Sequence, residues 1–212
     1  MKLYIPAFFS TSYETKINKK LRQPETLALA NKDYNELWKL KIHAEKVAAS
    51  LHELKSIVHN KSSMNDLNKY TTEAFDLVIR GGKLNPTLLN QVQNSLFHLH
   101  NELLDYACWE VTLSCLNVIS NSFLLGFGGT STLLLTAAAL TGPASAVLFS
   151  MGMAILAATI TVLAAYSLYV DARFIVDQQI ADIEEGVKFL SNFKSNHLYE
   201  PVSQNYSTYS YE

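Results

Sequence analysis

Residues 111–170 read VTLSCLNVISNSFLLGFGGTSTLLLTAAALTGPASAVLFSMGMAILAATITVLAAYSLYV. These 60 residues include no Asp, Glu, Lys, Arg or His, so every charged residue of the 212-residue chain lies before or after the run. A water-soluble domain exposes part of any segment this long, and charged residues normally occupy the exposed positions. A helix needs roughly 20 apolar residues to cross the hydrocarbon core of a bilayer. The run is therefore long enough for two transmembrane helices and a turn.

The turn is marked by Gly142 and Pro143, near the middle of the run. Glycine is common just after the end of a helix, and proline is well tolerated in the first turn of the next. We therefore predict a helical hairpin with arms at residues 111–141 and 144–170 and a tip at residues 141–144. The side chains and tip residues expected to meet lipid are Leu113, Leu116, Phe123, Leu134, Gly142, Pro143, Phe149, Leu156 and Leu163.

Small and polar residues within the run predict how the arms pack together. Ser150, Ala154 and Ala158 recur every four residues, and such a stripe allows a partner helix to approach closely. Asn117 and Asn121 are also four residues apart. In lipid, their amides should point at another helix and hydrogen-bond across to it.

The first arm contains a glycine cluster, at positions 126, 128 and 129. Glycine inside a helix weakens it, so the cluster predicts a kink or a break in this arm. The alternative for the arm is two shorter helices, at residues 110–125 and 131–140, that enter the membrane without a clean crossing.

Apolar residues in steps of three and four lie on both sides of the run and predict the core-facing seams of helices. The seam residues are Leu37, Val47, Leu51, Leu54, Leu89, Leu96, Leu99, Leu103, Ile180, Ile183 and Val187. Gly81 and Gly82 should end one helix, and Asn85 and Pro86 should open the next. No breaker separates the seams from the apolar run. We therefore predict an all-α protein in which a helical bundle or coiled-coil stalk is continuous with the hairpin.

The predicted organisation has five parts. Residues 1–33 form an N-terminal segment whose lysine-rich part, at 10–24, reads best as a solvated loop, with a frayed helix or a surface for anionic lipid head groups as alternatives. Residues 34–110 form the bundle, residues 111–170 the transmembrane hairpin, residues 171–196 a helix completing the bundle, and residues 197–212 a flexible tail.

Composition and motifs argue against several classes of function. The net charge of −2 and the pI of about 6.3 carry no signature of nucleic-acid binding. His98, Glu102 and Asp105 share a helical face, but the His-Glu-x-x-His spacing of a zinc site is absent. There is no Gly-x-Ser-x-Gly motif, and no neighbouring basic residue activates Cys108. The sequence therefore predicts no catalytic residue, no metal, no cofactor and no enzymatic activity.

The flanks of the hairpin predict its topology. A hairpin with two spans leaves both soluble parts, and both termini, in one compartment. Of the 17 Lys and Arg residues, 14 precede residue 111. Because cytoplasmic flanks are enriched in these residues, we predict that this compartment is the cytoplasm.

This layout resembles small membrane-inserted effectors of intravacuolar bacteria, such as the type IV effectors of Legionella and Coxiella. It is also similar to chlamydial inclusion-membrane proteins, which share a two-lobed hydrophobic hairpin. The resemblance rests on the hairpin, on the adjacent seams and on the tail at residues 203–212, which has the Ser, Thr and final Glu of a short polar secretion signal. It implies a non-enzymatic effector that is anchored in a host or bacterial membrane and presents helical surface to a protein partner or to a second copy of itself.

Two other classes remain open. In a pore or channel, Ser114, Asn117 and Asn121 would line the lumen of an α-helical oligomer. In a soluble helical adaptor, the bundle would bury the hairpin, in an arrangement similar to that of pore-forming colicins.

Overall fold

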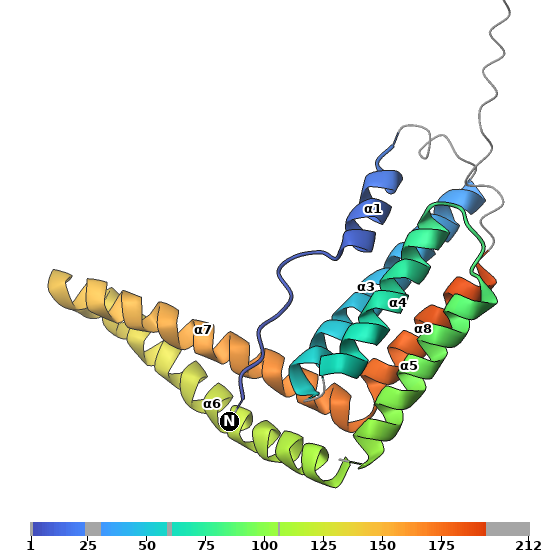
Figure 1. The fold of residues 1–212 in the computed structure, drawn as a ribbon. Coiled ribbons are helices and arrows are strands. Elements are labelled where there is room, and N and C mark those ends of the chain that lie inside the picture. The colour runs from blue at the N-terminus through green and yellow to red at the C-terminus, as the bar shows by residue number, and fades with distance from the viewer. Residues whose placement is uncertain (1, 24–30, 59–60, 106, 194–212) are drawn as a thin grey trace, which may run out of the picture.

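A computed structural model describes residues 2–23, 31–58, 61–105 and 107–193, which form seven α-helices and no strand. The helices are α1 (Ser12–Leu21), α3 (Asn31–Ile57), α4 (Lys61–Ile79), α5 (Pro86–Asp105), α6 (Ala107–Thr141), α7 (Ala144–Ile175) and α8 (Gln178–Asn192). Two limbs diverge from a common elbow, one a bundle of the shorter helices and the other the hairpin of α6 and α7 (Figure 1). The all-α prediction is confirmed. The predicted tail at residues 197–212 lies outside the described residues.

The bundle is built from α3, α4, α5 and α8, with α1 against α3 and α4. Its core contains the predicted seams, because a stripe of apolar residues must leave water on one helical face. Leu37, Val47, Leu51, Leu54, Leu96, Leu99, Ile180, Ile183 and Val187 are buried, and Leu89 and Leu103 are partly buried against them. Gly186 on α8 allows close packing on α3, because a Cβ there would lie 2.3 Å from a methyl group of Val47.

The lysine-rich part of the N-terminal segment is a helix, so its interpretation as a solvated loop was wrong. Thr11 and Glu14 form a capping box, in which the Thr11 hydroxyl accepts from the Glu14 amide and the Glu14 carboxylate accepts from the Thr11 amide. Tyr13, Ile17 and Leu21 lie on one face of α1 and are buried. The Tyr13 ring stacks on Phe75 of α4, with ring centroids 4.7 Å apart. The capping box and the apolar face therefore outweigh the polar composition of the segment.

The residues predicted to end α4 and to begin α5 do so in the connection between these helices. The α4 helix ends at Ile79, and Gly81 takes a φ of 84°, a left-handed conformation that glycine adopts at little cost. The Asn85 side chain accepts a hydrogen bond from the Thr87 amide at 3.0 Å, and Pro86 is the first residue of α5.

The hairpin forms with its turn at the predicted position, and Gly142 and Pro143 separate the two arms. The break expected as one outcome at the glycine cluster is absent, because α6 runs unbroken from Ala107 to Thr141. Gly128 instead serves close packing, since a Cβ there would lie 2.4 Å from the Thr161 Oγ1 atom on α7. Contact with α7 thus compensates for the weak helix propensity of glycine.

The arms do not continue straight into the bundle, so the prediction of an uninterrupted stalk was wrong at both ends. One helix ends at Asp105 and the next starts at Ala107 in a new direction (Figure 1). On the other side α7 continues to Ile175, beyond the predicted boundary at residue 170, and Asp177 takes a left-handed φ of 53° before α8. This reversal lets α8 bury Ile180 and Ile183 in the bundle core.

Candidate functional site

The first candidate site is the apolar surface of the hairpin. Most side chains predicted to meet lipid lie outside any protein core: Leu113, Leu116, Phe123, Leu134, Phe149 and Leu156 are exposed, whereas Leu163 is partly buried. Gly142 and Pro143 form the tip. In the most apolar 18-residue stretch of each arm, none of α6 and 6% of α7 is buried. The described helices of the bundle therefore do not wrap the hairpin, and both arms are long and apolar enough to cross a membrane.

Hydroxyl groups on the hairpin satisfy their own hydrogen bonds. Each of several threonine hydroxyls donates its proton to the main-chain carbonyl four residues earlier in the same helix. The pairs include Thr132 to Gly128 at 2.8 Å, Thr136 to Thr132 at 2.7 Å and Thr159 to Ile155 at 2.8 Å. Polar groups in hydrocarbon need partners within the protein, and this pattern supplies them without a second chain.

The length of the hairpin beyond Asn121 and Ala164, which has no charged or amide side chain, matches a bilayer. Thr141 lies 20 positions after Asn121 on α6, and Ala164 lies 20 positions after Ala144 on α7. At a rise of ~1.5 Å per residue, each stretch spans about 30 Å, which is the thickness of a typical hydrocarbon core. Between these stretches and the bundle, the sides of the two arms that face each other carry polar residues.

The small-residue stripe lies on the side of α7 that packs against α6. Ser150 is buried, and Ala154 and Ala158 are partly buried. Ala157 and Thr161 lie next to Gly128 of α6. The arms therefore approach through small side chains, as the sequence predicted.

The second candidate site is a polar cluster at the base of the hairpin, centred on Asp171 of α7. Its carboxylate accepts hydrogen bonds from the Asn117 amide of α6 at 2.5 Å and from the Tyr4 hydroxyl at 3.0 Å. Ser114 of α6 also hydrogen-bonds to it. Asp171, Asn117 and Tyr4 are all buried. The predicted bond from Asn117 across to the other arm is thus confirmed, with Asp171 as its partner.

The N-terminal segment completes this cluster with its main chain. The Lys2 amide donates to Asn117 Oδ1 at 2.6 Å, and the Tyr4 amide donates to the Ser167 hydroxyl at 2.7 Å. Asn121 donates to the Lys2 carbonyl at 3.3 Å, so its partner is this segment and not a helix. Sequence analysis missed the role of Tyr4, because a short stretch of mixed residues has no periodicity that indicates its partner.

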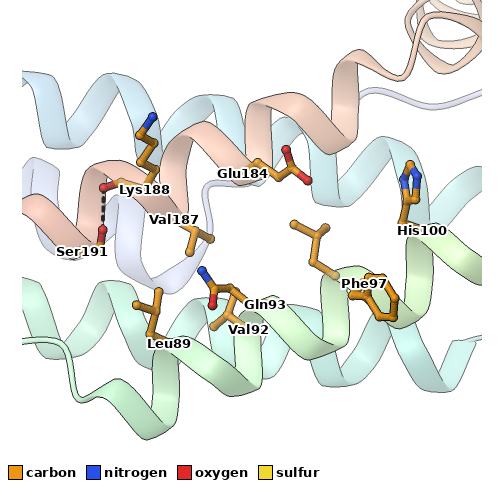
Figure 2. A pocket seen from close by; sticks show the side chains of 10 residues that line it. Leu89, Val92, Gln93, Phe97, His100, Glu184, Val187, Lys188 and Ser191 are labelled. Carbon is orange, nitrogen blue, oxygen red and sulfur yellow. Dashed lines mark hydrogen bonds between the residues drawn. The ribbon is translucent and has the colours of Figure 1, made fainter.

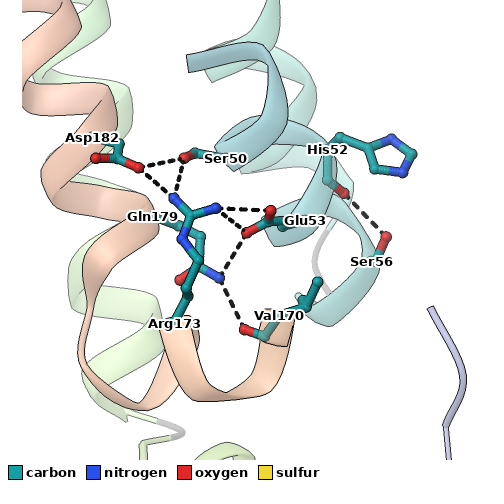
Figure 3. Close-up of polar contacts among 8 residues, drawn as sticks. All are labelled: Ser50, His52, Glu53, Ser56, Val170, Arg173, Gln179 and Asp182. Carbon is teal, nitrogen blue, oxygen red and sulfur yellow. Dashed lines mark hydrogen bonds and ion pairs between the residues drawn. The ribbon is translucent and has the colours of Figure 1, made fainter. Parts of the chain in front are cut away.

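A second polar group, the third candidate site, joins the hairpin to the bundle at the elbow (Figure 3). Arg173 Nη1 lies 2.8 and 2.7 Å from the two carboxylate oxygens of Glu53 on α3. Arg173 Nη2 donates to Ser50 at 3.1 Å and also contacts Asp182 of α8. Burial raises the pKa of Glu53, while the charge of Arg173 and a hydrogen bond from Gln179 oppose that rise.

Gln179 connects the same group to the main chain of α7. Its amide donates to Glu53 at 3.1 Å and to the Val170 carbonyl at 3.1 Å. Sequence analysis did not identify this group. Its one visible signal is that Glu53 lies between the seam residues Leu51 and Leu54, where a solvated carboxylate is unexpected.

The described bundle also has a groove of about 390 Å³ between α5 and α8 (Figure 2). Apolar side chains from both helices line it: Leu89, Val92, Leu96, Phe97 and Val187. Polar residues border it, among them His100, Glu184 and Lys188. Phe97 is 62% exposed, so the groove offers an apolar contact at the surface of the bundle.

Within the described residues, no three His, Cys, Asp or Glu side chains are grouped as a metal site would require. The sequence placed His98, Glu102 and Asp105 on one helical face. Of these, Glu102 accepts a hydrogen bond from Ser63 at 3.0 Å. Comparison with known protein families, characterised proteins and solved structures finds no match to this chain.

Proposed function

We propose that this chain is a membrane-anchored, non-enzymatic protein whose hairpin lies in a bilayer and whose bundle presents helical surface to a protein partner. The observation that carries the proposal is the exposure of two apolar arms, each with about 30 Å of uncharged helix beyond Asn121 and Ala164. Leaving this much apolar surface in water would be highly unfavourable, and burial in hydrocarbon removes that cost.

In this arrangement the bundle and the N-terminal segment stay on one side of the membrane, and the uncharged tip approaches the other. The excess of Lys and Arg before residue 111 favours the cytoplasmic side for the bundle. The resemblance to effectors of intravacuolar bacteria implies that the membrane belongs to a host cell. The anchored bundle would then recruit or tether a host protein. The groove between α5 and α8 is the best candidate surface for that partner, because apolar side chains line it and its lining residues belong to the bundle and not to the hairpin arms.

The pore-forming alternative receives less support from the contacts. A pore would require the side chains of Ser114, Asn117 and Asn121 to line its lumen. In the described chain these side chains are buried. Asn117 and Asn121 bond to Asp171 and to the N-terminal segment. The surface of α6 that remains exposed is uncharged and mostly apolar, so an oligomer would have to break these contacts to line a water-filled path with the asparagines.

Membrane extraction tests the anchor. The full chain, expressed in cells, should remain with the membrane pellet after washing with alkaline carbonate and should require detergent for release. The paired variant Leu134→Lys with Leu156→Lys places two charges at the middle of the hydrocarbon core and should shift the protein to the soluble fraction or cause its degradation. Phe97→Lys is the matched control, because it makes the same change at an exposed apolar residue of the bundle.

Two results would contradict the proposal. Release of the unmodified protein by carbonate would reject the anchor. Leakage of a trapped dye from liposomes that contain the purified protein would favour the pore instead, since an anchor should leave the bilayer sealed.

A further inference from the structure

The N-terminal segment and α1 lie on the side of the bundle that faces the hairpin (Figure 1). The segment starts at the base of the hairpin, where Lys2 contacts Asn117 and Asn121, and then passes α3, where the Ile5 carbonyl lies 2.9 Å from His52 Nε2. Asn121 is also the last amide side chain of α6, beyond which the helix has no charged or amide group. A bilayer that contains the arms down to Asn121 therefore has its surface beside this segment.

Two aromatic residues project from the segment. Phe8 is 75% exposed and Phe9 is 91% exposed, and neither contributes to the core of the bundle. Their neighbour Tyr4 is buried in the polar cluster, so the segment is held in place a few residues before them. Aromatic side chains on a fixed backbone next to an inserted hairpin are well placed to enter the interfacial region of a bilayer.

The outer face of α1 is basic. Lys19 and Arg22 are exposed on the side away from the buried Tyr13 and Ile17, whereas Lys16 pairs with Asp76 of α4. Residues 2–22 carry five basic residues and one acid, Glu14, whereas the whole chain has a net charge of −2. The Glu14 carboxylate is engaged in the capping box of α1. This charge separation favours a negatively charged surface as the contact of α1.

We propose that Phe8, Phe9 and the basic face of α1 form a second membrane contact, which binds the anionic lipid head groups of the leaflet that the hairpin enters. This inference rests on the proposed anchor and adds to it a lipid class and an orientation. With both contacts made, the bundle lies over the membrane with α1 against the lipid. The groove between α5 and α8 then faces away from the membrane, because α1 packs on α3 and α4 and makes no comparable contact with α5 or α8.

The test uses an environment-sensitive fluorophore on the full chain. Cys108→Ser and Cys115→Ser remove the native thiols, and Phe9→Cys introduces one for labelling with NBD. The protein is reconstituted in vesicles of phosphatidylcholine, with and without phosphatidylserine. We expect the emission at position 9 to shift to shorter wavelength in the vesicles that contain phosphatidylserine, while the same label at Phe97→Cys reports water in both.

Charge reversal tests the basic face. Lys19→Glu with Arg22→Glu should weaken the shift at position 9, since each basic residue near an anionic surface strengthens binding about fivefold. Lys188→Glu, on α8, is the matched control and should leave the shift unchanged. Circular dichroism of each variant verifies that the helices form, and both substituted residues of the test pair are exposed.

The outcomes separate this inference from the anchor. If the protein resists carbonate extraction but position 9 reports water in both vesicles, the second contact is rejected and the anchor stands. If carbonate releases the protein while position 9 still shifts on anionic vesicles, the surface contact stands and the anchor is rejected. A shift of equal size without phosphatidylserine would reject the preference for anionic lipid.

Discussion

Arg173 of α7 and Glu53 of α3 form a buried ion pair between the hairpin and the bundle, with Nη1 2.8 and 2.7 Å from the carboxylate oxygens. The side chains are 9% and 3% exposed. The same guanidinium contacts Asp182 of α8, so one cation joins three helices at the elbow. The pair is therefore the main polar determinant of how the two limbs are joined.

Arg173→Met should destabilise the protein by about 3–5 kcal/mol, because it leaves the buried Glu53 carboxylate without its cation. Chemical denaturation in detergent, followed by circular dichroism, measures the loss. Lys39→Met is the control, since it breaks the exposed Lys39–Glu36 pair and should cost less than about 1 kcal/mol. Equal effects of the two substitutions would show that the elbow does not depend on the buried pair.

Gly128→Leu should separate the arms of the hairpin. A Cβ at this position would lie 2.4 Å from Thr161 Oγ1, and overpacking typically costs about 1–3 kcal/mol. Gly126→Leu is the matched control, because a Cβ there meets nothing within 4 Å. Distances between spin labels on the two arms should lengthen for Gly128→Leu alone. An unchanged distance distribution would show that the arms do not pack closely at Gly128.

Tyr4→Phe should loosen the N-terminal segment from the hairpin base. It removes the hydrogen bond to Asp171, and a bond to a charged group is worth about 1.5–3 kcal/mol. Hydrogen exchange of residues 2–9 should become faster while the exchange of α4 stays the same. In an Asp171→Asn background the additional effect of Tyr4→Phe should be smaller. Full additivity of the two substitutions would show that the residues are not coupled.

Acidification should weaken the packing of α3 on α8 through His43, whose ring stacks on Phe189 with centroids 4.2 Å apart. Burial lowers the pKa of His43 below its ordinary value, while Glu185 acts to raise it and Lys46 to lower it. As the pH falls, His43 therefore takes up its proton more readily in the unfolded chain than in the folded one. The contribution of neutral His43 to the free energy of unfolding is complete above about pH 6.5 and is lost progressively below it.

The measurement is the unfolding free energy at about pH 7.5 and about pH 5.5, on either side of the ordinary histidine pKa. The unmodified protein should lose more stability between the two than His43→Gln, which cannot gain a proton. The same loss in both proteins would assign the pH dependence to other groups.

The groove between α5 and α8 should be the contact site of a protein partner. A photo-crosslinking residue in place of Phe97 should give a discrete adduct in cells, because this side chain is exposed beside the groove. The same residue at Asn68, an exposed polar position on α4, should give none. Adducts of equal yield at both positions, or at neither, would count against the groove.

The sequence by itself determined the helical class, the hairpin, its turn and the burial of most seam residues. These features are local or periodic: an apolar stripe must leave water, and Gly142 with Pro143 interrupts a helix wherever it lies. The capping box of Thr11 and Glu14 was equally local and was overlooked in favour of composition.

Only the tertiary structure decided the bends between hairpin and bundle, the unbroken course of α6 and the partners of the buried polar residues. A heptad pattern does not say whether two helices are collinear, because the same seam can pack in either arrangement. Gly128 weakens a helix in isolation but strengthens contact with α7. Tyr4 and Asp171 are 167 positions apart, and Arg173 and Glu53 are 120 positions apart. No local pattern pairs residues at such separations, since their proximity results from the packing of the whole chain.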